Sequence, residues 1–351
     1  MNLLNEIDNL PAGLLELDAG QLHAALGGPT LIHLKGRRSP PLFVSVLMHG
    51  NETTGWEAIR RVLKDYLVEG ELDLPRDLSL FIANTSAAAE GMRHLPGQPD
   101  FNRVWPGGDA EQGDEARIMR QVVDSMAERE IFAAVDIHNN TGINPHYGCI
   151  NVLEHEALHL ATLFSRTVVY FVRPRGVASM ALAALGPSVT LECGKVGQGA
   201  GVSHAVEYLD ACLHLSELPK HAVAEHDVDL FHTVAIVRVA SEVAFGFGDN
   251  GYALDFNADL DRLNFRELPI GTSLGRVLSE DVLPLDVRDE EDRSVTDRYF
   301  EVEQGRLKTR LPVMPSMLSC DSTVIRQDCL CYLMERYDQH LHDADCLQMD
   351  T

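Results

Sequence analysis

The segment His49-Gly50-Asn51-Glu52 places an imidazole and a carboxylate three residues apart, directly after the apolar run LFVSVLM at residues 42–48. Such a run is typical of a buried central strand, so both side chains are expected on a turn at its carboxyl end, where open α/β sheets bind ligands. Imidazole nitrogen and carboxylate oxygen both bind zinc. The pair alone is also consistent with purely structural roles, in which the histidine caps a strand and the glutamate lies in the first turn of a helix.

A second histidine, His138, ends another apolar run at residues 131–138 and precedes the turn-like sequence Asn139-Asn140-Thr141-Gly142. Two strands would then each deliver a histidine to the same edge of the sheet. Two histidines and one carboxylate leave a fourth zinc position open, which is typical of catalytic rather than structural sites. We therefore predict that His49, Glu52 and His138 hold one Zn²⁺ per chain. Asp136 could orient His138, or it could pair with a neighbouring arginine.

Glu192 is the single charge in the apolar segment SVTLECG at residues 188–194. Carboxylates are seldom buried without a partner, so one interpretation pairs Glu192 with Lys195 or an arginine. The other makes it the catalytic base. We favour the base, because a further strand end is involved and a zinc site that activates water needs a group to accept the proton.

A long polar loop after the predicted strand at residues 78–84 carries Asp100-Phe101-Asn102-Arg103. Asn102 and Arg103, next to an aromatic residue, could clamp a carboxylate through a bidentate guanidinium contact. Arg93 lies ten residues before Arg103 on the same loop. On these residues alone, a surface salt-bridge role fits equally well.

The elements that must position these residues follow from hydrophobic patterning. Apolar runs predict strands at residues 42–48, 78–84, 131–138, 167–172 and 188–194. Helical periodicity predicts helices at residues 56–70, 115–130, 156–165 and 200–217. This alternation predicts an α/β domain over residues 1–228, with a mixed, largely parallel sheet flanked by helices. Short β-prone runs separated by Gly, Pro, Asn and Asp predict a smaller β-rich domain at 229–351.

Composition narrows the partners. The 351-residue chain has 29 basic and 53 acidic residues and a formal charge of −24, which disfavours binding to nucleic acid or an anionic membrane. An anionic small-molecule substrate would need a local cluster of arginines. Seven scattered cysteines argue against a disulfide framework, and the N-terminal segment lacks the basic region of a signal peptide. We expect a cytoplasmic protein that binds neither nucleic acid nor membrane, and leave a homo-oligomer open.

Residues 40–200 resemble the succinylglutamate desuccinylase/aspartoacylase family, a branch of the zinc carboxypeptidase superfamily. The resemblance is carried by HGNE (49–52), AAAEGMRHLPGQPDFNR (87–103), DIHNNTG (136–142) and TLECG (190–194). It implies a zinc-carboxypeptidase-like fold and zinc bound by His49, Glu52 and His138. It also implies Glu192 as the base and a substrate carboxylate held by Asn102 and Arg103.

Arg93 resembles a further arginine of the family. Family members often have another arginine before the catalytic glutamate and a tyrosine in the β-rich domain. Candidates for such further substrate contacts are Arg173, Arg175, Tyr252 and Tyr299.

The leading interpretation is a zinc-dependent deacylase that hydrolyses the amide of an N-acyl amino acid or a similar small acid. One alternative is a zinc carboxypeptidase that acts on short peptides with the same residues. The long segment after Glu192 favours the deacylase, because the resemblance implies that the extra domain narrows the cleft. The other alternative is a regulatory protein that binds zinc without turnover, and the presence of Glu192 argues against it.

Overall fold

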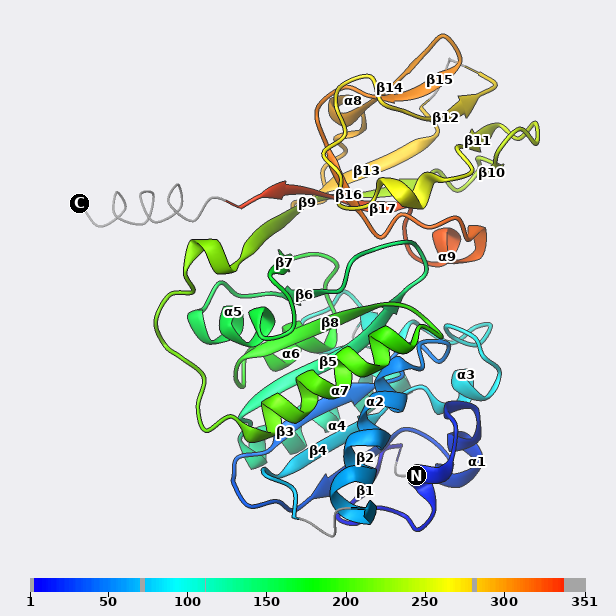
Figure 1. Ribbon diagram of the computed structural model, residues 1–351. Helices are drawn as coiled ribbons and strands as arrows, with labels where there is room; N and C mark the ends of the chain where they lie inside the picture. Colours follow the sequence, from blue (N-terminus) through cyan, green and yellow to red (C-terminus); the bar gives the residue numbers. More distant parts are fainter. Residues whose placement is uncertain (1–2, 70–72, 111, 280–282, 338–351) are drawn as a thin grey trace. The chain divides into compact units, whose positions relative to one another are not determined.

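The computed structural model describes residues 3–69, 73–110, 112–279 and 283–337 (Figure 1). The chain forms two compact units. The first comprises Met1–Asn140, His146–Val168 and Pro174–Asp227, and the second comprises Thr141–Pro145, Val169–Arg173 and Val228–Thr351. The main division thus lies between Asp227 and Val228, next to the predicted boundary, while two short segments from the first half of the chain belong to the second unit.

The first unit is built on a mixed, largely parallel sheet, which confirms the predicted fold class. Its strands run in the order β1-β2-β4-β3-β5-β8-β6. Strand β3 is parallel to β4 and β5, and β5 is parallel to β8, whereas β2 is antiparallel to β4 and β6 is antiparallel to β8. The strands are β1 Asn5–Ile7, β2 Thr30–Leu34, β3 Leu42–Val46, β4 Leu78–Ile82, β5 Ala133–Asn140, β6 Tyr147–Ile150 and β8 Ser188–Lys195, and β7 Thr167–Tyr170 crosses the unit boundary.

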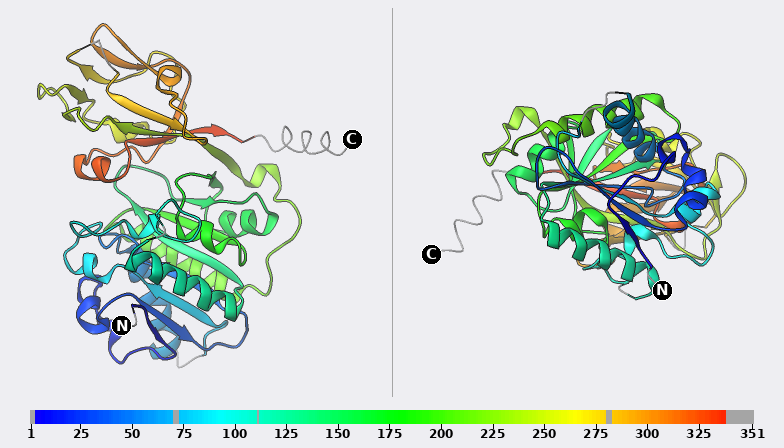
Figure 2. Two further views of the ribbon diagram at one scale, coloured as in Figure 1. Left: turned by 180° about the vertical axis from the view of Figure 1, so that it is seen from behind. Right: turned by 90° about the horizontal axis from the view of Figure 1, so that it is seen from below.

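Helices cover both faces of this sheet, with α2 beside α7 on one face and α4 on the other (Figures 1 and 2). On the α4 side, Phe43 and Phe81 of the strands pack with Met119 and Val122 of the helix. The helices are α1 Leu22–Leu26, α2 Thr54–Lys64, α3 Thr85–Ala89, α4 Asp114–Arg129, α5 His155–Thr162, α6 Ala178–Leu182 and α7 Gly199–His214. Short 3-10 turns lie at Leu14–Glu16, Ala19–Gln21, Phe101–Arg103 and Glu225–Asp227.

Helix α2 approaches the sheet closely at its amino end. A Cβ on Gly55 would lie 2.9 Å from Cγ1 of Val46, so only glycine allows this contact without a shift. The predicted helix at 56–70 is shorter in its α-helical part, because the backbone changes to a π-helical turn at Asp65–Glu69. Residue 70, where the helix was predicted to end, lies outside the described residues. This close packing of α2 against the sheet holds the preceding turn in place.

The second unit is β-rich, as the sequence predicts. Strand β9 (Asp229–Val239) pairs antiparallel with β13 (Leu285–Asp289) and β17 (Cys331–Arg336), and β16 (Met314–Ser316) pairs with β17. A separate five-stranded sheet has the order β10-β11-β12-β15-β14. Its strands are Phe245–Phe247, Leu254–Phe256, Ser273–Val277, Arg306–Thr309 and Phe300–Glu303, in that order. The unit also contains the 3-10 turn Leu260–Leu263 and the helices α8 (Thr296–Tyr299) and α9 (Ser322–Gln327).

Among the helices of the described residues, none has both the length and the apolar character that a membrane span requires.

Candidate active site

His49 and Glu52 lie on the turn between β3 and α2, at the carboxyl end of a central strand. The backbone amide of Glu52 donates to the carbonyl of His49 at 3.0 Å, which closes the turn. A Cβ on Gly50 would lie 2.2 Å from the backbone nitrogen of Ala88, so the turn can pack against α3 only with glycine at this position. The sequence His-Gly-Asn-Glu therefore folds both functional side chains to the same side.

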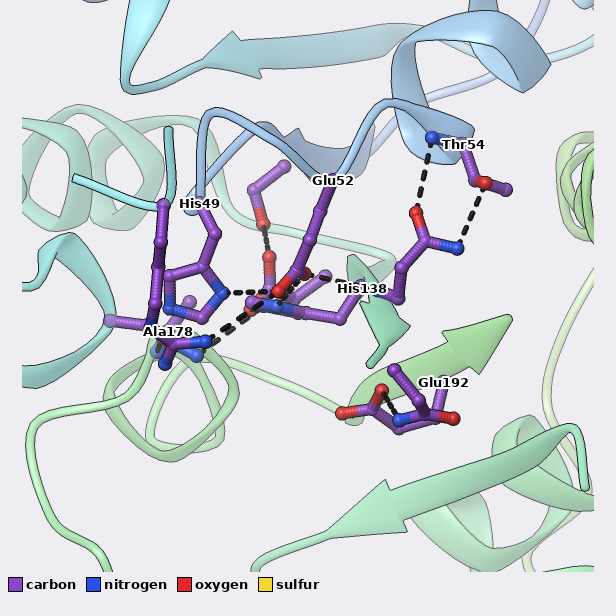
Figure 3. Close-up of polar contacts among 12 residues, drawn as sticks. His49, Glu52, Thr54, His138, Ala178 and Glu192 are labelled. Carbon is purple, nitrogen blue, oxygen red and sulfur yellow. Dashed lines mark hydrogen bonds and ion pairs between the residues drawn. The ribbon is translucent and has the colours of Figure 1, made fainter. Parts of the chain in front are cut away.

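The structure brings His49, Glu52 and His138 together (Figure 3). Nδ1 of His49 is 2.8 Å from Oε1 of Glu52, and Nδ1 of His138 is 2.9 Å from Oε2 of the same carboxylate. One potential ligand atom from each residue lies within 4.8 Å of the other two, and all three residues are buried. Two imidazoles and one carboxylate are the donor set of catalytic zinc sites, so these residues fit a zinc ion.

The second ring nitrogen of each histidine, Nε2, contacts a further carboxylate. Nε2 of His138 is 2.8 Å from Oδ2 of Asp136, and Oδ1 of Asp136 accepts a hydrogen bond of 2.7 Å from the hydroxyl of Ser45. Nε2 of His49 is 3.1 Å from Oδ1 of Asp100. Such contacts fix the orientation of metal-binding imidazoles. Of the two roles left open for Asp136, the structure shows the contact with the histidine.

The charges in this cluster reinforce one another. Burial lowers the pKa of His138, but Asp136 and Glu52 outweigh it and hold that pKa well above its usual value. The pKa of His49 is also raised, because Glu52 and Asp100 outweigh burial and a nearby arginine. Burial raises the pKa of Glu52, but the two histidines outweigh it and leave the pKa below the usual value. The same negative surroundings would favour a divalent cation bound to the neutral imidazoles.

Glu192 lies on β8, where it is the register partner of His138 on β5. It is buried, and its Oε2 accepts a hydrogen bond of 2.5 Å from Nδ2 of Asn140. Within the described residues Glu192 forms no salt bridge, so the alternative of a pair with Lys195 or an arginine is not what the structure shows. Burial raises the pKa of Glu192 to about 8, with His138 acting against it and Glu52 in the same direction.

The three predicted substrate-binding residues lie around the cluster. Arg93 donates to Oδ2 of Asp100 at 2.9 Å, and its Nη1 is 3.7 Å from Oε1 of Glu52. Nδ2 of Asn102 is 3.3 Å from Nε2 of His138. Arg103 follows in the same 3-10 turn and donates to the carbonyl of Asn102 at 2.8 Å. Contact of Arg93, Asn102 and Arg103 with a substrate stays a prediction.

The contact between Asp100 and His49 was not predicted from the sequence. Asp100 was visible as part of the Asp100–Arg103 segment, yet it lies 51 residues from His49. Its Oδ1 also accepts from the backbone amide of Asn102 at 2.8 Å, so one carboxylate organises the loop and contacts the imidazole. The proximity of DFNR to the histidines depends on how the loop packs. There, Asn102 Oδ1 accepts from the amide of Ala178 at 3.0 Å.

The further candidates for substrate contact differ in their surroundings. Tyr299 is 4 % exposed and packs in the apolar core of the second unit. Tyr252 is exposed in the same unit, and Arg173 donates to the carbonyl of Glu290 at 2.6 Å. Arg175 is exposed on the first unit.

Residues 39–208, which contain the whole cluster and Glu192, match the model described as the succinylglutamate desuccinylase/aspartoacylase catalytic domain. This segment is therefore a catalytic domain of the succinylglutamate desuccinylase/aspartoacylase family. The resemblance inferred from HGNE, DIHNNTG and TLECG is confirmed. A comparison with curated proteins gave no match.

Solved structures of similar fold include enzymes of this family. A succinylglutamate desuccinylase from Vibrio parahaemolyticus has 15 % identity and a TM-score of 0.58, covering 88 % of this chain and 86 % of its own. One from Chromobacterium violaceum has 19 % identity and a TM-score of 0.53, covering 86 % of each chain. Murine aminoacylase 3 has 17 % identity and a TM-score of 0.52, covering 86 % of this chain and 97 % of its own. At these identities the likeness establishes the fold.

Proposed function

We propose that this protein is a zinc-dependent hydrolase that cleaves an amide bond of a small, carboxylate-bearing substrate, as an N-acyl amino acid deacylase does. The observation that carries the proposal is the buried group His49, Glu52 and His138 with Glu192 on the adjacent strand. The family supports hydrolysis of an acylated amino acid, since similar structures are named as succinylglutamate desuccinylases and an aminoacylase.

The three clustered residues would hold the metal through Nδ1 of each histidine and the carboxylate of Glu52. Bound there, zinc would supply a positive charge that acidifies water towards a pKa of about 7 and polarises the substrate carbonyl. Asp136 and Asp100 would keep the two imidazoles in place through their Nε2 atoms.

Glu192 is suited to move the proton. Without a metal its pKa is raised to about 8, because it is buried. The charge of a nearby cation favours the ionised form of a carboxyl group, so Glu192 would be a carboxylate in the working enzyme. It would accept a proton from the attacking water and then deliver it to the nitrogen of the leaving amine.

The substrate carboxylate is assigned to Asn102 and Arg103, with Arg93 adding positive charge beside the cluster. A guanidinium can bind a carboxylate through two parallel hydrogen bonds, which fixes orientation as well as charge. The formal charge of the whole chain is −24, so attraction of an anion must come from these local groups. The same charge underlies our proposal that the protein binds neither nucleic acid nor anionic membrane, and the scattered cysteines underlie our proposal that it works in the cytoplasm.

The decisive experiment is a substrate panel. The purified, zinc-loaded protein is incubated with succinyl, acetyl and longer acyl derivatives of acidic and neutral amino acids, and with short peptides, and the released amines are quantified. We expect turnover of acyl amino acids, absent in Glu192→Gln. Preference for peptides would establish the carboxypeptidase alternative. Full zinc occupancy without any amide hydrolysis would establish the regulatory alternative.

A further inference from the structure

The two asparagines after His138 belong to strand β5, although their sequence suggested a turn. Strand β5 continues to Asn140, and both Asn139 and Asn140 are buried. The register with β8 shifts here, because His138 pairs with Glu192 but Asn140 pairs with Lys195. Between these two pairs, β8 advances by three residues and β5 by two, so β8 contains one extra residue. The extra residue is accommodated at Gly194, whose φ is +74°. A bulge of this kind re-aims the side chains around it.

The side chain of Asn140 points at Glu192. Its Nδ2 donates to Oε2 of the carboxylate at 2.5 Å. Among the described residues, this amide is the single hydrogen-bond donor to the side chain of Glu192, and no residue of the described chain donates to Oε1. The two oxygens of the carboxylate are therefore in different situations, one held by the protein and one without a protein donor.

The hydrogen bonds of Asn139 hold the backbone at the end of β5, next to Asn140. Its Nδ2 donates to the carbonyl of Gly194 and to the hydroxyl of Thr54, each at 2.9 Å. Its backbone amide donates to Oε2 of Glu52 at 3.0 Å. The end of β5 is thus tied to β8, to the start of α2 and to a residue of the metal cluster.

We propose that Asn140 is a positioning residue for the catalytic base. Its amide holds one oxygen of Glu192, so that the other oxygen is the one that takes the proton of the attacking water. This inference rests on the proposed function. It assigns a role to a residue that the sequence showed only as part of a turn-like segment.

An amide is suited to this role because it donates a hydrogen bond without adding a charge. A lysine or arginine at the same place would form an ion pair and make the carboxylate a weaker base. An aspartate would present a second carboxylate, and like charges at this distance cannot both remain ionised. Asparagine fixes the carboxylate and lowers its basicity less than a cation would.

Several ionisable groups act on Glu192, and their effects must be separated from that of Asn140. These are His138, Asp136, His49, Glu52, Cys149 and Cys193. Substitution of Asn140 changes none of them. Because a hydrogen bond to the charged form of a carboxyl group favours that form, its loss should raise the pKa of Glu192 further.

The test compares the parent with Asn140→Ala and Asn140→Gln, using a substrate that the panel identifies. A hydrogen bond to a charged group contributes about 1.5–3 kcal/mol, so kcat of Asn140→Ala should fall by about 10- to 100-fold. KM should change by less than about threefold, zinc content should stay the same, and the acid limb of the pH–rate profile should move to higher pH. Asn140→Gln keeps the amide and should recover part of the loss.

A matched control is Asn84→Ala. Asn84 is a buried asparagine of the same unit whose side chain accepts from the amide of Ala87 at the start of α3. Its loss should lower the melting temperature and leave kcat within about twofold, since it caps a helix and does not contact Glu192. An Asn140→Ala variant that behaves like this control would overturn the proposal.

A readout without turnover separates this inference from the proposed function. Infrared spectra recorded across pH should contain a carboxyl band that disappears in Glu192→Gln. We expect the midpoint of this band to rise in Asn140→Ala, and we expect no additional loss of activity when Asn140→Ala is added to Glu192→Gln. If Asn140→Ala does not fold, Asn140→Leu, which is uncharged, of similar size and without the donor, replaces it. An unmoved band overturns the role of Asn140 even if the parent hydrolyses no substrate.

Discussion

Two buried glutamates lie in different regions of the first unit, Glu52 on the turn before α2 and Glu192 on strand β8. Each is 5 % exposed, yet their pKa values move in opposite directions. Burial raises both, but in Glu52 the charges of His49 and His138 outweigh it. In Glu192 burial prevails and the pKa is about 8.

The difference follows from the number and charge of the neighbours. Glu52 is in contact with two imidazoles and a backbone amide, whereas Glu192 receives one neutral side-chain amide from the described residues. A carboxylate surrounded by donors and cations is suited to bind a metal, and one in an apolar strand is suited to exchange a proton. Burial alone would not separate a ligand from a base.

The largest effect should come from the Glu52 region. His49→Ala or His138→Ala removes one of the three donors, so we expect loss of zinc and hydrolysis at background level with the fold retained. Elemental analysis and circular dichroism check this. His33→Ala is the control, because His33 is a buried histidine of the same unit that contacts Ser79 and Glu6 instead of the cluster. Full zinc in both site variants would refute the metal assignment.

The Glu192 region should respond differently. Glu192→Gln keeps the shape and the hydrogen-bonding capacity but cannot accept a proton, so zinc should remain while kcat falls by about 10²- to 10⁴-fold. Substrate affinity should change little, and the acid limb of the pH–rate profile should vanish in the residual activity. Loss of zinc in this variant would make Glu192 a ligand and erase the distinction between the two glutamates.

A smaller effect is expected at Arg103, whose proposed role is to hold the substrate carboxylate and not to bind the metal or transfer the proton. Arg103→Ala should raise KM for an acidic substrate by about 10- to 100-fold, because charge-assisted hydrogen bonds of about 1.5–3 kcal/mol are lost. Arg103→Lys should recover little, since an ammonium cannot form the paired contact. Unchanged KM values in both variants, measured by steady-state kinetics, would show that Arg103 does not hold the substrate.

The smallest effect concerns the stability of the metal-free protein. The folded pKa of Glu192 is raised from 4.5 to about 8, so its protonated form stabilises the fold fully below pH 4.5, and this contribution is lost as pH rises through about 8. Glu192→Gln removes the dependence. With a chelator present, its melting temperature should exceed that of the parent at pH 9 and the two should converge near pH 4.5. Parallel melting curves at all pH values would contradict the raised pKa.

Several elements were already fixed by local sequence. The apolar runs before His49 and His138 predicted the strands β3 and β5, and the periodicity of residues 115–130 predicted α4. Glu192 stood out because it is the single charge in the apolar segment at residues 188–194. These predictions succeeded because alternation, apolar length and capping act between residues close in the chain.

Other features depend on contacts between segments distant in sequence. The antiparallel strand β6 and the short helix α6 were not predicted, because each is only four or five residues long and its apolar pattern is too short to show a period. The pairing of Asp100 with His49 and the contact of Asn140 with Glu192 span 51 and 52 residues.

The sequence by itself therefore determined which side chains could carry the chemistry and that strand ends would present them. Tertiary structure decided which carboxylate supports each histidine, and it made Asn140 a strand residue facing Glu192 instead of part of a turn. The reason is physical: the orientation of a side chain at a strand end is set by register and bulges across the sheet. Those are properties of the neighbouring strand, which no local pattern encodes.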